Sequence, residues 1–382
     1  MRGLMGEKKY LFAYETLRNE ILCGKFSCRT PFPSVTAVLR RFGISRLTSV
    51  KVFDRLKADG LIYARSGAGT FVSRRGAFRK IGLIFPGVVP YSEYFQPIVS
   101  EMTRLAQVES FELRLGNICA PDVRSRTHEV RELAAAFIRE KVSGVIYQPL
   151  EYVDDADDVN VRILSVLTKA RIPVVLLDSD ILPPPGRSPH DLVTIDNADA
   201  GERLANHLFT RGARNIHFFR LPEMLPTVAK RLRGVIASVA LHGCVWSEAC
   251  VLAAQPDDKM RIRRHLRKSP RPDAFVCEND TVAAVLLRTL AELRVRVPED
   301  IMLAGFDDIE HARLTVPSLT TVRQPCAQIA ETAFRRLVDR ITHPELEPIS
   351  ISLPAPLVVR GSTARTGPAQ QTPSTRRRRQ RT

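Results

Sequence analysis

Cationic and hydroxyl-bearing side chains surround the start of a predicted helix that Ser45 caps. Four side chains of this helix recur at positions i, i+3, i+4 and i+7 and are expected to face a core: Ser49, Val52, Phe53 and Leu56. The outward side then carries Arg46, Leu47, Val50 and Lys51, with Thr48 at its flank. Guanidinium, ammonium and hydroxyl groups donate hydrogen bonds to phosphate oxygens and base edges. The chemistry available here is the binding of a polyanion.

The sequence lacks the spacings of catalytic and metal sites. Its eight histidines never fall at HxxxH or HxH, and no GxSxG, P-loop or GxGxxG occurs. The acidic run EYVDDADD at 151–158 lacks the alternating spacing and the terminal Glu of a calcium loop, so we expect solvated surface there. Seven dispersed cysteines form no CxxC pair, which argues against disulfides and zinc. We expect no enzyme, no metal and no cofactor.

The net charge of +16 is unevenly spread along the 382 residues. Residues 1–80 hold 17 Lys and Arg against 5 Asp and Glu, 363–382 hold 6 Arg and no acid, and 81–362 hold 34 against 36. A basic head and a basic tail therefore flank a near-neutral body, and the head requires a polyanionic partner. With 44% hydrophobic residues, no run of 18 apolar residues and no secretory signal, we expect a cytoplasmic protein that is not in a membrane.

The elements of the head form three helices and a hairpin. A helical stripe runs from Tyr10 to Leu22, and Ser34 can cap a second helix that Gly43 ends. After the third helix, short strands at 60–65 and 70–72 are joined by a turn whose glycines permit positive φ. This order predicts a winged helix-turn-helix.

Four motifs of the head, PFPS at 31–34, FGISRLT at 42–48, LKADGLI at 56–62 and SGAGTFV at 66–72, resemble the GntR-type winged helix in order and spacing. The resemblance implies that the third helix enters the major groove of an operator and that the wing approaches the minor groove. It departs from the family at Leu47 and Val50, where polar or basic residues are usual. The residues expected to contact double-stranded DNA are Ser34, Thr36, Ser45, Arg46, Leu47, Thr48, Lys51, Arg65 and Gly67.

Apolar strands alternate with helices throughout the body. Strands are expected at 81–85, 144–148, 173–178, 191–196, 215–219, 273–277 and 301–306, and helices near 93–109, 159–170, 198–211, 227–241 and 280–293. Such alternation predicts an α/β fold with parallel sheets covered on both faces. About 280 residues favour two sheets, with a ligand between two lobes at the carboxyl ends of the strands.

Five ordered motifs of the body resemble the sensor domain of LacI/GalR repressors, which is similar to periplasmic sugar-binding proteins. They are RLRG at 231–234, END at 278–280, VPEDIMLAGFDD at 297–308, PSLTTVRQP at 317–325 and VVRGS at 358–362. The positions that the resemblance assigns to a small-molecule effector are Tyr94, Phe95, Asp178, Arg231, Asn279 and Asp307. Their donors, acceptors and aromatic faces suit a carbohydrate, or a base stacked on a ring.

The sequence predicts four successive regions along the chain. Residues 1–75 form the DNA-binding domain, 76–80 a linker, 81–362 the effector domain and 363–382 a disordered Arg-rich tail. Within the effector domain we expect one lobe from 81–180 with 308–325 and another from 181–307 with 326–362. The predicted function is a homodimeric transcriptional repressor whose operator affinity an effector controls. The alternative is a small-molecule binding protein whose head docks a protein partner.

Overall fold

The computed structural model describes residues 2–22, 25–26, 31–73, 79–86, 94–109, 111–118, 122–150, 156–182, 185–268 and 270–364. The chain divides into two units. Unit 1 comprises Met1–Thr194 and Cys326–Ile351, and unit 2 comprises Ile195–Pro325 and Ser352–Thr382. No helix among the described residues is long and apolar enough to cross a membrane.

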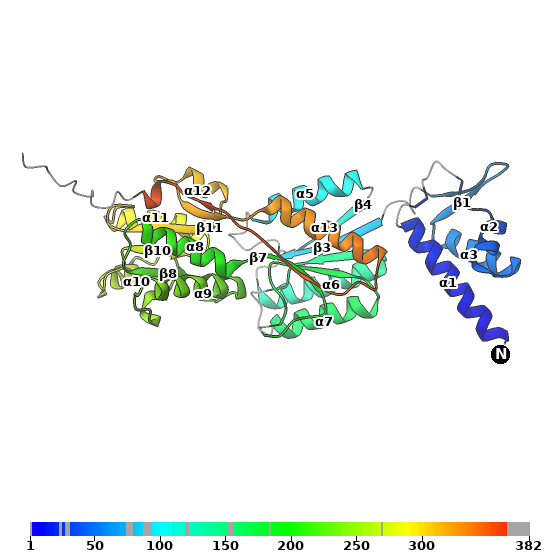
Figure 1. Cartoon of the computed structure of the whole chain (residues 1–382), viewed down its shortest axis with the longest axis horizontal. Helices are drawn as coiled ribbons and strands as arrows, with labels where there is room; N and C mark the ends of the chain where they lie inside the picture. The colour runs from blue at the N-terminus through cyan, green and yellow to red at the C-terminus, as the bar shows by residue number, and fades with distance from the viewer. Residues whose placement is uncertain are drawn as a thin grey trace, which may run out of the picture. The chain divides into compact units, whose positions relative to one another are not determined.

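The first part of unit 1, called the head below, is the predicted winged helix-turn-helix (Figure 1). Its elements are α1 (Arg2–Leu22), α2 (Val35–Phe42), α3 (Arg46–Ala58), β1 (Ile62–Arg65) and β2 (Gly69–Val72). Ser34 and Ser45 cap α2 and α3 as predicted, because their Oγ atoms accept the backbone N–H groups of Ala37 and Thr48 at 3.2 and 3.1 Å. Gly43 ends α2 at φ +57°, the conformation expected of a C-capping glycine.

The remainder of unit 1 is built on a six-stranded sheet of order β13-β7-β6-β5-β3-β4. The strands are β3 (Arg79–Pro86), β4 (Phe111–Ile118), β5 (Gly144–Tyr147), β6 (Val174–Leu177), β7 (Asp191–Ile195) and β13 (Ser350–Leu353). From β4 to β7 neighbouring strands are parallel. The associated helices are α5 (Phe95–Val108), α6 (Val123–Arg139), α7 (Ala156–Lys169) and α13 (Cys326–Thr342). Every residue of β5 and β6 is buried, as in a sheet covered on both faces.

Unit 2 has a second six-stranded sheet, of order β14-β12-β11-β10-β8-β9. Its strands are β8 (Ile216–Arg220), β9 (Val251–Ala253), β10 (Ala274–Cys277), β11 (Met302–Asp307), β12 (Thr320–Arg323) and β14 (Leu357–Val358). All pairs are parallel except β12 with β14. The helices are α8 (Asn197–Thr210), α9 (Pro226–Leu241), α10 (Lys259–His265), α11 (Asp280–Glu292) and α12 (Glu310–Leu314), with short 3-10 turns η1 (Glu248–Cys250) and η2 (Gly361–Thr363). The predicted α/β fold with two parallel sheets is confirmed.

Helices α8 and α9 pack backbone against backbone. A Cβ placed on Gly234 of α9 would overlap the carbonyl oxygen of Ala198 and lie 2.7 Å from the backbone nitrogen of Glu202. A Cβ placed on Gly201 of α8 would overlap the carbonyl group of Arg231. Two glycines therefore set the distance between these helices, which carry residues of the polar cluster described below.

The predicted assignment of the last segments to the lobes is wrong. Strand β12, within 308–325, pairs in parallel with β11 and so belongs to unit 2. Helix α13, at the start of 326–362, packs on α5, β5 and β6 of unit 1. Residues 181–194 also belong to unit 1 and not to the second lobe, whereas 352–362 lies in unit 2 as predicted. The βα alternation carries no information about which sheet a strand or helix joins, so 308–325 and the segment of α13 were exchanged. The elements of the body that were not predicted are strands β4, β9, β12, β13 and β14 and helices α6, α10, α12 and α13.

Three predicted features fall largely outside the described residues. The linker was predicted at 76–80, of which 76–78 are not described and Arg79 and Lys80 belong to β3. The acidic run at 151–158 is described only from Ala156, and the Arg-rich tail at 363–382 only at Thr363 and Ala364.

Candidate DNA interface and effector site

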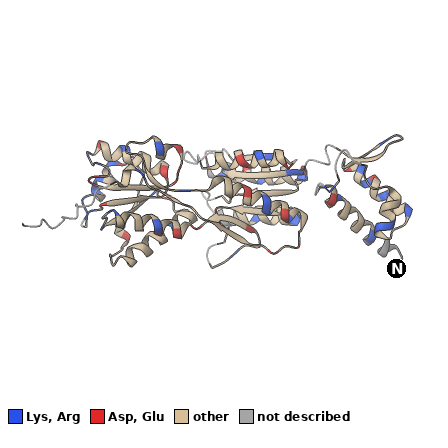
Figure 2. Cartoon of the chain, turned by 45° about the horizontal axis from the view of Figure 1, so that its top comes forward, with Lys and Arg blue, Asp and Glu red and all other residues tan. Residues whose placement is uncertain are grey.

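The outer face of α3 has the composition predicted for it. Arg46, Leu47, Val50 and Lys51 are exposed, and the buried side consists of Ser49, Val52, Phe53 and Leu56. Thr48 is half-buried, and its Oγ1 lies 2.8 Å from Ser45 Oγ, so this hydroxyl takes part in the cap. Lys and Arg are distributed over the helices of the head (Figure 2).

The wing is held by the segment that precedes α2. The backbone N–H of Phe32 donates to the carbonyl of Thr70 at 2.6 Å, and Pro31 forms a bridge with Phe71. The turn between β1 and β2 contains Gly67 at φ +71°, and Gly69 begins β2 at φ +105°; both conformations favour glycine. Gly67 and Arg65 are exposed in this wing, and Ser34 and Thr36 are exposed around the start of α2.

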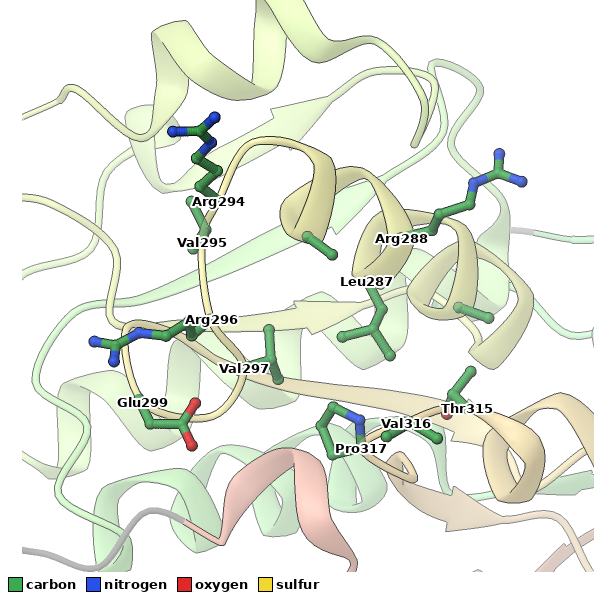
Figure 3. A pocket seen from close by; sticks show the side chains of 12 residues that line it. Leu287, Arg288, Arg294, Val295, Arg296, Val297, Glu299, Thr315, Val316 and Pro317 are labelled. Carbon is green, nitrogen blue, oxygen red and sulfur yellow. The ribbon is translucent and has the colours of Figure 1, made fainter.

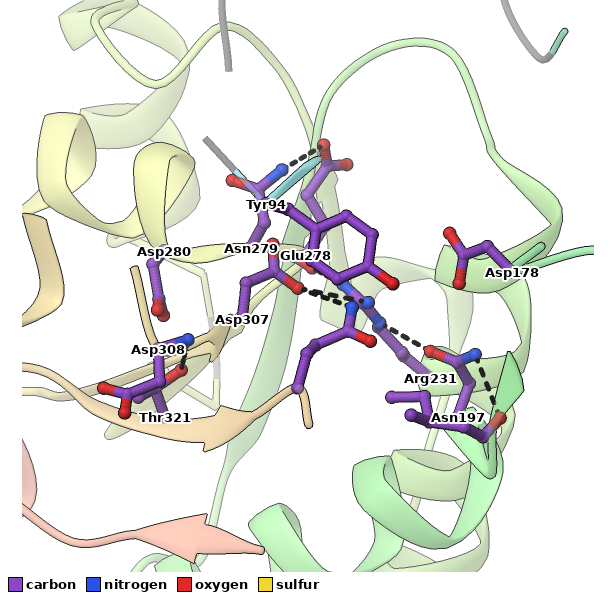
Figure 4. A network of polar contacts seen from close by, with 12 residues as sticks. Tyr94, Asp178, Asn197, Arg231, Glu278, Asn279, Asp280, Asp307, Asp308 and Thr321 are labelled. Carbon is purple, nitrogen blue, oxygen red and sulfur yellow. Dashed lines mark hydrogen bonds and ion pairs between the residues drawn. The ribbon is translucent and has the colours of Figure 1, made fainter. Parts of the chain in front are cut away.

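In unit 2, a buried guanidinium joins four elements. Arg231 of α9, 5% exposed, donates from Nε to Asn197 Oδ1 at 2.9 Å and from Nη1 to the carbonyl of Glu278 at 2.6 Å. Its Nη2 lies 3.3 Å from Asp307 Oδ1, which also accepts from Gln324 Nε2 at 3.0 Å (Figure 4). The guanidinium carbon sits 4.5 Å from the centroid of the Phe306 ring. We call Asn197, Arg231, Glu278, Asp307 and Gln324 the polar cluster.

The sheet of unit 2 explains why these residues meet. Asp307 ends β11, Glu278 follows β10 and Gln324 follows β12. These strands are parallel neighbours, so their carboxyl ends lie at one edge of the sheet, where ligands bind in open α/β folds. Asp307 adopts φ +106°, a strained conformation for a residue with a Cβ. Arg231 and Asp307, each predicted as an effector residue, are in direct contact.

Two further carboxylates, those of Asp280 and Asp308, lie next to this edge of the sheet. The side chain of Asp280 accepts the backbone N–H of Ile309 at 3.3 Å, and a Cβ at Gly305 would overlap it. Burial raises the pKa of Asp280 well above its usual range. Asp308 accepts from Arg360 at 2.5 Å and from Arg323 at 2.6 Å. Against the effect of burial, these two hydrogen bonds hold the pKa of Asp308 below its usual range.

Asn279 has a structural role in addition to the predicted effector role. Its Oδ1 caps α11 by accepting the backbone N–H of Val282 at 2.8 Å, and its Nδ2 lies 3.5 Å from Glu278 Oε1. The amide therefore connects the helix to the polar cluster.

The other three predicted effector residues belong to unit 1. Tyr94 is buried directly before α5, and its ring meets that of Phe95 edge-on at 4.8 Å. Phe95 in turn packs on Phe85 at 5.5 Å. Asp178, 8% exposed, follows β6 at φ +69°, and its carbonyl accepts the hydroxyl of Thr194 at 2.7 Å.

Sequence reasoning missed Asn197, Glu278 and Gln324. Each directly follows a strand or opens the helix after one, so the rule that polar residues at strand ends form sites could have found them. It also missed a buried pair, His217 Nδ1 and His265 Nε2, 2.7 Å apart on β8 and α10. Burial lowers the pKa of His217 to about 4 and that of His265 to about 3. Among the described residues no three His, Cys, Asp or Glu side chains group as metal ligands.

The carboxyl of Glu278 makes the stability of unit 2 dependent on pH. Glu278 is 1% exposed, and burial raises its pKa from 4.5 to about 7, although the N–H of Leu221 donates to Oε2 at 2.8 Å. Stability that is fully present below pH 4.5 is therefore lost as the pH rises through 7. Glu278→Gln should match the wild type at pH 4.5 and exceed it by about 3 kcal/mol at pH 8 in urea unfolding. A difference that does not grow with pH would contradict this assignment.

Two protein families match the chain. The family described as "Bacterial regulatory proteins, gntR family" matches residues 9–72, and the family described as "Periplasmic binding protein-like domain" matches residues 205–363. The arabinose metabolism transcriptional repressor of Geobacillus stearothermophilus is 28% identical over 366 residues, which cover 93% of this chain and 97% of the relative. The HTH-type transcriptional repressor PurR of Escherichia coli O1:K1 / APEC is 30% identical over 278 residues, 71% of this chain and 76% of the relative.

Solved structures share the fold. The complex of transcriptional regulator CelR with cellobiose has a TM-score of 0.63 at 23% identity, covering 87% of this chain and 100% of the other. Transcription regulator CcpA of Lactococcus lactis has a TM-score of 0.63 at 21% identity, covering 75% of this chain and 99% of the other.

Proposed function

Since the chain belongs to the LacI/GalR-type transcriptional regulators and carries a gntR-type DNA-binding domain, we propose that it represses transcription and that a small-molecule effector controls its operator affinity. The observation that carries this proposal is the pairing of two sites on one chain. One is a basic winged helix-turn-helix, and the other is a buried polar cluster at the carboxyl edge of a parallel sheet.

The head binds double-stranded DNA through α3 and the wing. Arg46 stands in the first turn of α3, where the second helix of such a motif contacts base edges. Lys51 and Arg65 are exposed cations that contact phosphates, and Gly67 lets the wing backbone approach the duplex. Ser34, Ser45 and Thr36 lie at or beside helix N-termini, which favour phosphate.

Arg46→Ala should weaken binding to a duplex selected from random DNA by about 10- to 100-fold, because a bidentate Arg–guanine pair contributes about 1–3 kcal/mol of discrimination. Fluorescence anisotropy at fixed salt measures the loss. Lys57→Ala is the matched control, because it removes one positive charge from the exposed C-terminal turn of α3. If Arg46→Ala and the wild type bind the duplex with equal affinity, Arg46 does not contact the DNA.

The effector binds at the polar cluster of unit 2. Asp307 and Arg231 of the cluster, together with Asn279 beside it, present carboxylate, guanidinium and amide groups suited to vicinal hydroxyls, so we propose a carbohydrate. A carbohydrate effector is also supported by two similar proteins, the arabinose metabolism repressor and the CelR–cellobiose complex. The contribution of Tyr94, Phe95 and Asp178, and a position of the effector between two lobes, stay predictions.

Titration of the protein–operator complex with pentoses, hexoses, disaccharides and purine bases tests the effector. One compound should lower operator affinity and give a calorimetric binding signal with the protein alone. If none of these compounds changes operator affinity, the proposed control by such an effector is wrong.

We propose a homodimer that uses an apolar surface of unit 2. Val316 is 92% exposed and Leu314 is 70% exposed. Val316 borders a cavity of about 670 Å³ whose apolar lining includes Leu287, Val295 and Val297 (Figure 3). Exposed apolar surface of this kind marks protein interfaces, and a two-fold dimer presents two heads to two half-sites. Sedimentation equilibrium of the full chain decides between dimer and monomer.

A protein-docking head remains the alternative, and a salt titration separates the two. If the head binds DNA, a plot of log affinity for DNA against log salt concentration should fall with a slope of several units. If the head docks a protein, it should have no measurable affinity for DNA. With DNA as the partner, the protein acts in the cytoplasm and not in a membrane. The regulatory relatives support a protein that is not an enzyme.

A further inference from the structure

The centre of the outward face of α3 is apolar. The side chain of Leu47 is 72% exposed and that of Val50 is 41% exposed. At about 100° per residue, Leu47 lies opposite the middle of the buried side of α3, and Val50 stands one turn further along the same face. Two large apolar side chains therefore project from the face that the head offers to DNA.

The surroundings of these two side chains indicate what covers them. Exposed Arg46 and Lys51 flank them, so the face is a cationic surface with an apolar centre. Such a surface suits a partner that carries negative charge at its edges and an apolar group between them. The major groove of DNA has phosphates on both sides, and the C5-methyl group of thymine is the apolar group on its floor.

We infer that Leu47 and Val50 each contact the C5-methyl group of a thymine and so select thymine in the operator half-site. The inference rests on the proposed DNA-binding function and adds the base that α3 recognises. Side chains three residues apart on a helix are about 5–6 Å apart, and successive bases of a strand are about 3.4 Å apart. The two thymines therefore lie within about two base steps of each other.

Deoxyuridine tests this inference, because it differs from thymidine only by the missing methyl group. The full-length protein is first used to select binding duplexes from a random-sequence library. Each thymine of the selected half-site is then replaced by deoxyuridine, one at a time. At one or two positions the affinity should fall about fourfold, the value of one buried methyl-sized group.

Variants of the protein assign each thymine to a side chain. Leu47→Ala should bind the selected duplex more weakly and should no longer distinguish thymine from deoxyuridine at one position. Val50→Ala should do the same at the other position. Leu241→Ala is the matched control, because Leu241 is 73% exposed at the end of α9 in unit 2. It should change neither the affinity nor the response to deoxyuridine.

The outcomes separate the inference from the function on which it rests. If selection yields no preferred sequence, the head does not read bases, and both the proposed function and the inference fail. If selection yields a preferred sequence but deoxyuridine has no effect, the function stands and the inference is overturned. A deoxyuridine effect that persists in Leu47→Ala and Val50→Ala also overturns it, because other groups then contact the methyl.

Discussion

Gly234→Ala is expected to prevent unit 2 from folding stably, with a loss of about 4 kcal/mol or more in the free energy of unfolding. The added Cβ would overlap the carbonyl oxygen of Ala198 and crowd the backbone nitrogen of Glu202. Both atoms are backbone atoms of α8, so no rotamer change can relieve the overlap. Helix α9 must move away, and Arg231, three residues earlier on α9, would leave the polar cluster.

Trp246 makes this loss measurable, because the only tryptophan of the chain lies in unit 2 and is half-buried. Its fluorescence during urea unfolding should give a far lower midpoint for Gly234→Ala than for the wild type. Gly243→Ala is the control, since its Cβ meets nothing within 4 Å but its φ is +68°. That variant should lose only about 1–2 kcal/mol. If the two variants lose equal amounts of unfolding free energy, helices α8 and α9 can move apart at little cost, and the prediction is wrong.

Arg231→Met is expected to destabilise unit 2 by about 3–5 kcal/mol and to abolish the effect of the effector on operator affinity. The substitution removes the cation from Asp307, whose side chain is 13% exposed, and the donors from Asn197 and the Glu278 carbonyl. An uncompensated buried carboxylate is the main cost. Urea unfolding followed by Trp246 and calorimetry with the effector measure the two effects.

Two further variants distinguish lost charge pairing from other causes. Arg233→Met removes an exposed arginine two positions along α9 and should leave stability and effector binding unchanged. Arg231→Met combined with Asp307→Asn should recover part of the stability, because no unpaired charge remains in the double variant. Recovery of stability without recovery of effector binding is the expected pattern. If Arg231→Met alone is as stable as the wild type, the ion pair between Arg231 and Asp307 does not stabilise unit 2.

The head could be predicted almost completely from sequence because its signals are local. Ser34, Gly43 and Ser45 act within one turn of their own helix, and the spacing of Val52 and Leu56 defines a buried face without reference to any distant residue. The turn at Gly67 is equally local. Each expectation depended on neighbours in sequence, and each is confirmed.

The polar cluster could be predicted only in part because its members are distant in sequence. Arg231 and Asp307 were expected from motifs, and their contact is observed. The hydrogen bonds that connect Asn197 and Gln324 to this pair depend on the order of strands in the sheet, which hydrophobic alternation does not encode. The same missing information caused the exchange of α13 and β12 between the lobes.

The interleaving of the two units bears on how such a chain can be recombined. The chain passes between the units after Thr194, after Pro325 and after Ile351, so neither sheet is encoded by one continuous stretch. The described part of the head ends at Ser73, and among the described residues its sheet consists of β1 and β2 alone. One genetic crossover after the wing therefore suffices to give this sensor a different operator. Exchange of either sheet requires several simultaneous crossovers, because each sheet is built from separate stretches of the chain.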